Sequence, residues 1–218
     1  LHDDDRGDFA TNLFDPETKQ VVFVPQLGQN SQFTDPSYHM PHYYELWALW
    51  ADKDNDFWAD AVTASREYLP KAVHPKTGLA PNYSEFDGTP YPDEYNGNFR
   101  YDAFRVGANV GMDYVWFAPS QWHVEQSNRL LGFFASQGMD DYKAEYYLTG
   151  EPQVGHRASG LMATNAVAAL AADRAVGEPF VQALWDESIP TGTYRYYDGL
   201  LMMLGLLQVS GNFRIYEP

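Results

Sequence analysis

Apolar side chains recur every three or four positions along most of this chain, which is the pattern of helices that bury one face. From Pro36 onward the pattern predicts a first helix, and Asp54 or Asn55 then caps a second helix that ends near Pro70. A polar loop rich in turn-forming residues follows, from His74 to Tyr101. Helical periodicity then returns and continues almost to the end of the sequence.

Several further helices are expected after that loop. They are, in chain order, one capped by Asp102, one from Ser120 to Gly138, an alanine-rich one from about Ala158 to Val176, a short one with Pro179 in its first turn and its end near Trp185, and one from Arg195 to Leu207. Because long loops precede alternate helices, we expect antiparallel helix pairs that stack in series.

One stretch, Val21 to Val24, has the composition of a strand; Pro25 closes it, and we expect it to pair with Phe14 and its neighbours. No flexible linker or low-complexity segment interrupts the 218 residues. The sequence therefore predicts an all-α fold in one domain over 1–218. This fold is a helical-hairpin array with a short β element near the N-terminus.

The charge and the missing motifs exclude several classes of function. Acidic residues outnumber basic ones by 30 to 14, for a net charge of -16. This charge repels phosphate backbones and anionic lipids, so neither nucleic acid nor a membrane is expected as a partner. The chain has no cysteine and therefore no thiolate metal site. It also has no G-x-S-x-G, G-x-x-x-x-G-K or G-x-G-x-x-G motif, which argues against serine hydrolases and nucleotide enzymes.

Asp102 stands where a loop with many aromatic residues meets an apolar helix, and Arg105 follows about one helical turn later. One interpretation is structural, since a carboxylate at a helix start accepts hydrogen bonds from the free amides of the first turn. The other is proton chemistry on a sugar. Aromatic rings with a polar edge suit sugars, and the chain contains 16 Tyr, 13 Phe and 6 Trp. The residues alone leave both interpretations open.

Other chemically active residues have simpler interpretations. His39 and His42 lie three positions apart, but a proline between them and the lack of a Glu-x-x-His partner argue against a metal site. Asp113 and Asp198 lie within apolar helical patterns and are interpreted as buried hydrogen-bonding residues. His156 lies in a loop before a helix, where it is either a surface residue or part of a pocket. No metal ion or other cofactor is expected.

Three segments together resemble glycoside hydrolase family 8 in both order and spacing. They read Asp-Pro-Ser-Tyr-His-Met-Pro-His-Tyr-Tyr-Glu-Leu from Asp35, Tyr-Asp-Ala-Phe-Arg from Tyr101, and Tyr-Tyr-Asp-Gly-Leu-Leu from Tyr196. Within the family, the segments that begin at His74 and Glu85 look most like exo-oligoxylanases that release xylose from the reducing end. The resemblance covers essentially the whole chain.

This resemblance implies a fold, a reaction and roles for five residues. It implies part of an (α/α)6 barrel and hydrolysis of β-1,4-linked xylo-oligosaccharides with inversion. Asp102 would be the general base, Tyr38 would hold the attacking water, and Arg105 would orient the carboxylate or the sugar. Tyr197 would be an aromatic wall of the substrate cleft, and His156 would belong to a loop that closes the cleft beyond the reducing-end sugar.

The resemblance also implies that part of the catalytic domain lies outside this chain. The family's general acid lies in a Ser-Glu-Gly-x-x-Tyr-Gly motif, which this sequence lacks. We therefore expect the C-terminal portion of the barrel, with an N-terminal portion of the same enzyme as its partner. Alternatives are an endo-β-1,4-xylanase, a β-glucanase or a non-catalytic sugar-binding fragment. Because the first residues lack a secretion signal, a cytoplasmic location is expected, with a secreted or periplasmic one as the alternative.

Overall fold

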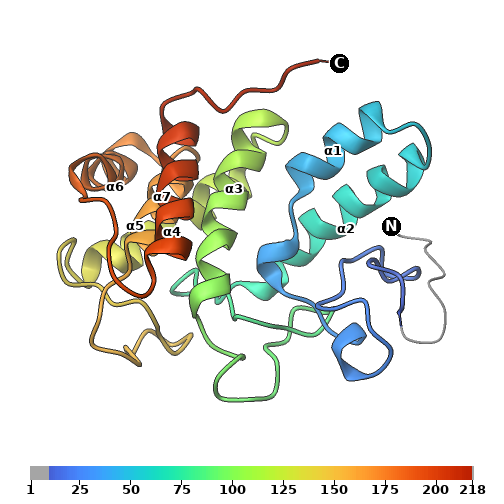
Figure 1. Cartoon of the computed structure of the whole chain (residues 1–218), viewed down its shortest axis with the longest axis horizontal. Helices are drawn as coiled ribbons and strands as arrows, with labels where there is room; N and C mark the ends of the chain where they lie inside the picture. Colours follow the sequence, from blue (N-terminus) through green and yellow to red (C-terminus); the bar gives the residue numbers. More distant parts are fainter. Residues whose placement is uncertain (1–9, 218) are drawn as a thin grey trace.

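The computed structural model describes residues 10–217, and its regular structure is helical (Figure 1). Its α-helices are α1 (Pro41–Trp50), α2 (Asn55–Ala72), α3 (Phe104–Trp116), α4 (Gln121–Ser136), α5 (Ser159–Ala168), α6 (Arg174–Asp186) and α7 (Arg195–Val209). Three short 3-10 helices are η1 (Gln29–Ser31), η2 (Pro36–Tyr38) and η3 (Tyr101–Ala103). The predicted helical fold is therefore confirmed.

The helices pack as consecutive hairpins. α2 packs on α1, α4 on α3 and α6 on α5, while α1, α3, α5 and α7 follow one another as neighbours in a row. α3 and α5 approach closely at Gly111, where a Cβ atom would collide with the carbonyl oxygen of Val167. The main core lies between these helices and fully buries Phe104, Leu131, Phe134, Leu161 and Phe180. Each such side chain contributes about 1.5–3 kcal/mol by leaving water.

The long loops position the candidate site. The loops that precede α3 and α7 emerge at the same end of the array, the lower end in Figure 1. A hydrogen bond of 2.6 Å from the Tyr197 hydroxyl, in the first turn of α7, to the carbonyl of Tyr101 in η3 joins the elements that follow these loops. Among residues 10–217, no helix combines the length and apolar character that a membrane span requires.

The predicted strand at Val21 to Val24 is wrong, although its expected pairing with Phe14 is found as an isolated antiparallel bridge between Phe14 and Val21. Successive residues here bond to different partners. The Val22 amide donates to Leu13, whereas the Phe23 amide donates to Phe33. No ladder can extend along a segment that changes partner at each residue, so isolated bridges form instead.

The predicted helix from Ala158 to Val176 is in fact two elements. α5 ends at Ala168, and α6 begins at Arg174, so Pro179 lies inside α6 rather than in its first turn. Asn128 on α4 holds the corner, because its side chain exchanges hydrogen bonds of 2.7 and 2.9 Å with Asp173. Gly177 lets α6 pack tightly over the end of α5, where a Cβ atom would stand 2.9 Å from the Cβ atom of Ala169.

Candidate active site

Asp102 lies in η3, immediately before α3. The interpretation of its side chain as the cap of that helix is wrong. The N-cap position of α3 belongs to Ala103, and no side chain caps it. The Asp102 amide is instead satisfied by Asn82, whose Oδ1 accepts its hydrogen bond at 3.1 Å. The carboxylate remains 31% exposed and pairs with Arg105 Nη2 at 2.9 Å through one oxygen. It is therefore available for chemistry rather than committed to the helix end.

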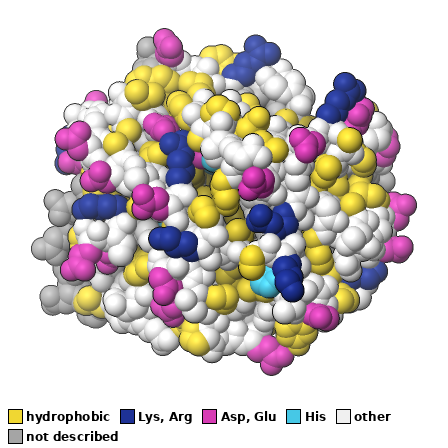
Figure 2. Space-filling view, turned by 180° about the vertical axis from the view of Figure 1, so that it is seen from behind, with side chains coloured by type: hydrophobic (Ala, Val, Ile, Leu, Met, Phe, Trp, Pro, Cys, Tyr) yellow, Lys and Arg dark blue, Asp and Glu magenta, His cyan; other side chains and the backbone are white. Residues whose placement is uncertain are grey.

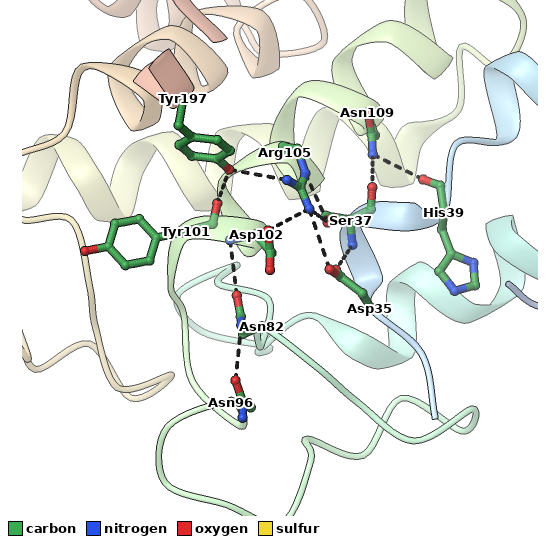
Figure 3. Close-up of polar contacts among 10 residues, drawn as sticks. All are labelled: Asp35, Ser37, His39, Asn82, Asn96, Tyr101, Asp102, Arg105, Asn109 and Tyr197. Atoms are coloured by element: carbon green, nitrogen blue, oxygen red, sulfur yellow. Dashed lines mark hydrogen bonds and ion pairs between the residues drawn. The ribbon is translucent and has the colours of Figure 1, made fainter. Parts of the chain in front are cut away.

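Arg105 connects three segments that are distant in sequence (Figure 3). Its Nε and Nη2 atoms donate to Ser37 Oγ at 3.2 and 2.7 Å. Nη2 also lies 3.6 Å from Asp35 Oδ2, and Nη1 donates to the Tyr197 hydroxyl at 3.4 Å. We call Arg105, Asp102, Asp35, Ser37 and Tyr197 the Arg105 cluster.

The turn from Asp35 to His39 is fixed to α3 at two points. Asp35 caps η2 by accepting the Ser37 amide at 2.7 Å, in a turn where Pro36 supplies the first helical position. Asn109, one turn beyond Arg105 on α3, donates to the carbonyls of Ser37 and His39 at 2.9 and 3.3 Å. The half-buried Tyr38 between them is thereby held beside Arg105, whose guanidinium carbon lies 5.9 Å from its ring centre.

Burial and the nearby carboxylates keep Tyr197 of the cluster and the adjacent Tyr38 protonated. Burial raises the pKa of Tyr38, and the neighbouring charges of Asp35 and Asp102 raise it further. Burial likewise raises the pKa of Tyr197 to about 12. Burial alone would lower the pKa of Arg105, but Tyr197, Asp102 and Asp35 raise it, so the guanidinium stays charged. The cluster therefore offers hydrogen-bond donors around an accessible carboxylate.

Four of the five predicted site residues lie together, and one lies elsewhere. Asp102, Tyr38, Arg105 and Tyr197 meet at the starts of η3, α3 and α7. His156 is exposed in its loop, where its carbonyl accepts the Ala144 amide at 2.9 Å. Within the described residues, no hydrogen bond or ion pair joins it to the Arg105 cluster. Its part in a substrate cleft therefore stays a prediction.

The sequence did not identify the residues that support Asp102 and Arg105. Asp35 and Ser37 are buried beneath Arg105, and Asn82 is buried beneath Asp102. The sequence did predict a helix start at Pro36, next to this turn. It gave no sign that this turn would contact Arg105, which is 68 positions beyond Ser37.

The remaining candidates have structural environments. Both ring nitrogens of His39 are engaged, by Thr34 Oγ1 at 3.0 Å and Ser65 Oγ at 2.9 Å, and burial lowers its pKa to about 3. Residues 10–217 contain no group of three His, Asp or Glu side chains that could hold a metal ion. Asp198 is half-buried and accepts the Gly160 amide at 3.2 Å.

Asp113 is buried and hydrogen-bonded, as predicted. Arg66 donates to it through Nε at 3.0 Å and Nη2 at 2.8 Å, and His123 lies 3.0 Å away. Arg66 Nη1 also donates to Glu45 at 2.7 Å. We call these four residues the Arg66 cluster, which joins α1, α2, α3 and α4.

Comparison with known proteins gives consistent matches. The sequence profile of glycosyl hydrolases family 8 matches residues 11–211. A reducing-end xylose-releasing exo-oligoxylanase of Paenibacillus barcinonensis is 43% identical over 99% of this chain and 57% of its own length. One of Halalkalibacterium halodurans is 42% identical over 94% of this chain and 53% of its own length. The chain thus spans little more than half the length of these relatives.

The fold agrees with solved structures as well. A crystal structure of a mutant reducing-end-xylose releasing exo-oligoxylanase in complex with xylobiose superposes with a TM-score of 0.88 at 42% identity. The superposition covers 95% of this chain and 55% of that one.

Proposed function

Because the chain belongs to glycosyl hydrolase family 8, we propose that it is the C-terminal portion of an inverting enzyme that cleaves β-1,4-xylo-oligosaccharides. The proposed product is xylose, released from the reducing end. Support comes from the relatives that are more than 40% identical, whose names carry this activity. Xylobiose bound to a similar structure supports a xylo-oligosaccharide as the substrate.

The observation that carries the proposal is the state of Asp102. A carboxylate that faces solvent, does not cap its helix and pairs with an arginine through one oxygen is suited to accept a proton from water. As the water oxygen bonds to the anomeric carbon, its proton passes to Asp102, and the glycosidic bond breaks on the opposite face. Tyr38 and Arg105 are proposed to hold the water and the carboxylate, and Tyr197 to form part of the cleft wall.

Inversion also needs a general acid, which protonates the leaving oxygen from a carboxyl group about 6.5–9.5 Å from the base. Asp35 is near Asp102 but has no exposed surface, so it cannot reach a glycosidic oxygen. We propose that the acid comes from an N-terminal portion of the enzyme, which completes the (α/α)6 barrel. This portion is either part of a longer polypeptide or a separate associated chain.

The two ends of the helix row support such a partner. Trp47, Leu49 and Trp50 on α1 are exposed, as are Met203 and Leu207 on α7. A hollow of about 460 Å³ beside α1 is lined largely by apolar and aromatic side chains, among them Phe14, Met40 and Trp47. Exposed apolar surface of this kind is typical of an interface. On the face drawn in Figure 2, by contrast, charges of both signs are interspersed without a continuous basic patch.

Product analysis of xylotriose hydrolysis tests the proposal. We expect no hydrolysis by the chain alone. When the N-terminal portion is present, we expect xylose from the reducing end together with xylobiose whose new reducing end is first formed as the α anomer. Proton NMR identifies the first anomer formed, and chromatography identifies the products. Cleavage inside longer xylans or β-glucans would favour the endo-acting alternatives. Binding without hydrolysis by the assembled protein would favour a sugar-binding fragment. Activity of the chain alone would refute the proposal that this chain supplies only the general base and the N-terminal portion the general acid.

Substrate binding by His156 and a cytoplasmic location also remain proposals. A His156→Ala variant of the assembled enzyme is expected to release xylose less selectively from the reducing end. Fractionation of producing cells into medium, periplasm and cytoplasm, followed by activity assays, tests the location.

A further inference from the structure

Asp35 has no role in the proposed reaction so far, although its carboxylate lies next to Arg105 and close to Asp102. Its side chain is 0% exposed. Oδ1 accepts the Ser37 amide at 2.7 Å. Oδ2 has no hydrogen-bond partner among the described residues, and it lies 3.6 Å from Arg105 Nη2 (Figure 3). Because an unsatisfied buried carboxylate oxygen is costly, the nearby guanidinium is the interaction that can compensate for it.

The same turn holds Arg105 at a second point, through the two hydrogen bonds to Ser37 Oγ. Arg105 Nη2 therefore lies near Ser37, Asp35 and Asp102 at once. Within residues 10–217, the pair with Arg105 is the one polar contact of the Asp102 carboxylate. The position of that carboxylate consequently depends on where Arg105 is held.

We infer that Asp35 is a positioning residue: in its charged form it holds the Arg105 guanidinium, which in turn fixes Asp102 to accept a proton from water. The catalytic consequence rests on the proposed function. The holding of Arg105 is a property of this chain alone and can be tested separately.

The hold on Arg105 is expected to depend on pH. Burial raises the pKa of Asp35 to about 7 and the Asp102 charge adds to this rise, while the Ser37 hydrogen bond and Arg105 oppose it. Below neutral pH the carboxyl is then uncharged and holds Arg105 weakly. The other groups that interact with it are Arg105 on α3, Asp102 in η3, Tyr38 in η2, Tyr68 on α2, Tyr83 in the loop before η3 and Tyr197 on α7. The tyrosines have raised pKa values and stay neutral near pH 7.

Kinetics of the assembled enzyme carrying Asp35→Asn provide the test, since asparagine has the shape of the uncharged carboxyl group. We expect the wild-type kcat to exceed the variant's by little near pH 5 and by about tenfold above pH 8, with KM less affected. Dividing the wild-type kcat by the variant kcat at each pH cancels the effect of groups that titrate in both enzymes. The matched control is Asp113→Asn, a buried carboxylate paired with Arg66, for which the ratio should not vary with pH. A pH-independent ratio for Asp35→Asn overturns the inference.

A second variant covers the case in which Asp35→Asn folds poorly. Ser37→Ala removes the other contact, so we expect roughly a threefold fall in kcat near pH 5 and a smaller one above pH 8. An unchanged kcat at every pH would overturn the inference.

A crystal structure of the Asp35→Asn assembled enzyme near pH 8 separates this inference from the proposed function. We expect the Arg105 guanidinium to have moved away from its wild-type position beside Asp102. An unmoved guanidinium overturns the inference whatever the activity. An inactive wild-type assembly counts against the proposed function instead, and the crystal structure then still decides whether Asp35 holds Arg105.

Discussion

The Arg66 and Arg105 clusters are built from the same parts, an arginine shared by two carboxylates, yet they differ in how completely the carboxylates are bound. Asp113 receives two hydrogen bonds from Arg66 and contacts His123, and its side chain is 1% exposed. Asp102 contacts Arg105 through one oxygen and is 31% exposed. A fully bound, sealed carboxylate stabilises the fold, whereas a partly bound, accessible one can exchange protons with a substrate.

The buried carboxylates of the two clusters extend this difference. Burial raises the pKa of both Asp113 and Asp35. The hydrogen bonds from His123 and Arg66 overcome this effect at Asp113, so its pKa is lowered overall. Asp35 has a more distant arginine and one hydrogen bond, and its pKa is raised to about 7. The number and geometry of the partners therefore decide the direction of the shift, because burial is common to both.

The largest expected effect is the loss of turnover on replacing Asp102. In the assembled enzyme, Asp102→Asn should lower kcat by about 10²–10⁴-fold, since it removes the proposed proton acceptor while keeping the shape of the side chain. Binding of xylotriose, measured by calorimetry, should change little. Asp113→Asn is the matched control and should retain turnover where it is folded. Equal loss of binding and turnover in Asp102→Asn would show that Asp102 has a structural role instead.

The next effect is on stability and should fall on the other cluster. Asp113→Ala leaves Arg66 and His123 without their partner, which should lower the free energy of unfolding by about 3–5 kcal/mol. Asp102→Ala should cost much less, because its side chain is 31% exposed and its backbone amide is held by Asn82. Urea denaturation of both variants measures the difference. Similar losses would remove the distinction between the clusters.

The lowered pKa of Asp113 adds a pH dependence with a defined sign. The folded state binds the proton of this carboxyl group less readily than the unfolded state does, so the group stabilises the fold above its ordinary pKa of 3.8. This contribution is lost as the pH falls through the lower, folded-state value. Denaturation in acid should therefore show a steeper loss of stability for the wild type than for Asp113→Ala.

Asp35 should show the opposite dependence, with a smaller overall effect. Its pKa rises from 3.8 to about 7 on folding, so between these values the folded state holds a proton that the unfolded state has lost. Stability should therefore fall as the pH rises across this window, by roughly 2–4 kcal/mol. Asp35→Asn should flatten this fall, which urea denaturation at a series of pH values measures. A variant with the wild-type slope would contradict the assignment.

The helices could be predicted from the sequence because their signals are local. Apolar spacing gave a helix near each of the seven α-helices found in residues 10–217, and Ser120 and Gly138 marked the start and end of α4 closely. The corner between α5 and α6 was placed too far along the chain, after Val176, because the alanine pattern continues through the true corner. The break depends on Asn128 from another helix.

The site was predictable to the extent that its residues resemble a known family. Asp102, Arg105, Tyr38 and Tyr197 come from segments that carry that resemblance, and the structure brings them together. The supporting contacts of Asn82 and Asn109 join residues far apart in the chain, which no local pattern encodes. The capping interpretation of Asp102 failed because η3 begins before it, at Tyr101, and its carboxylate pairs with Arg105.

The smallest expected effect concerns Tyr197, which links the Arg105 cluster to α7. Its hydroxyl donates to the Tyr101 carbonyl at 2.6 Å and accepts from Arg105 at 3.4 Å. Tyr197→Phe should lower the free energy of unfolding by about 1 kcal/mol, because a half-buried carbonyl loses its donor. Tyr196 is 79% exposed and directly adjacent, so Tyr196→Phe is the matched control and should have almost no effect. If both variants lost the same stability, the effect would belong to the start of α7 in general. A loss confined to Tyr197→Phe would show that even the accessible cluster contributes to stability through its tyrosine.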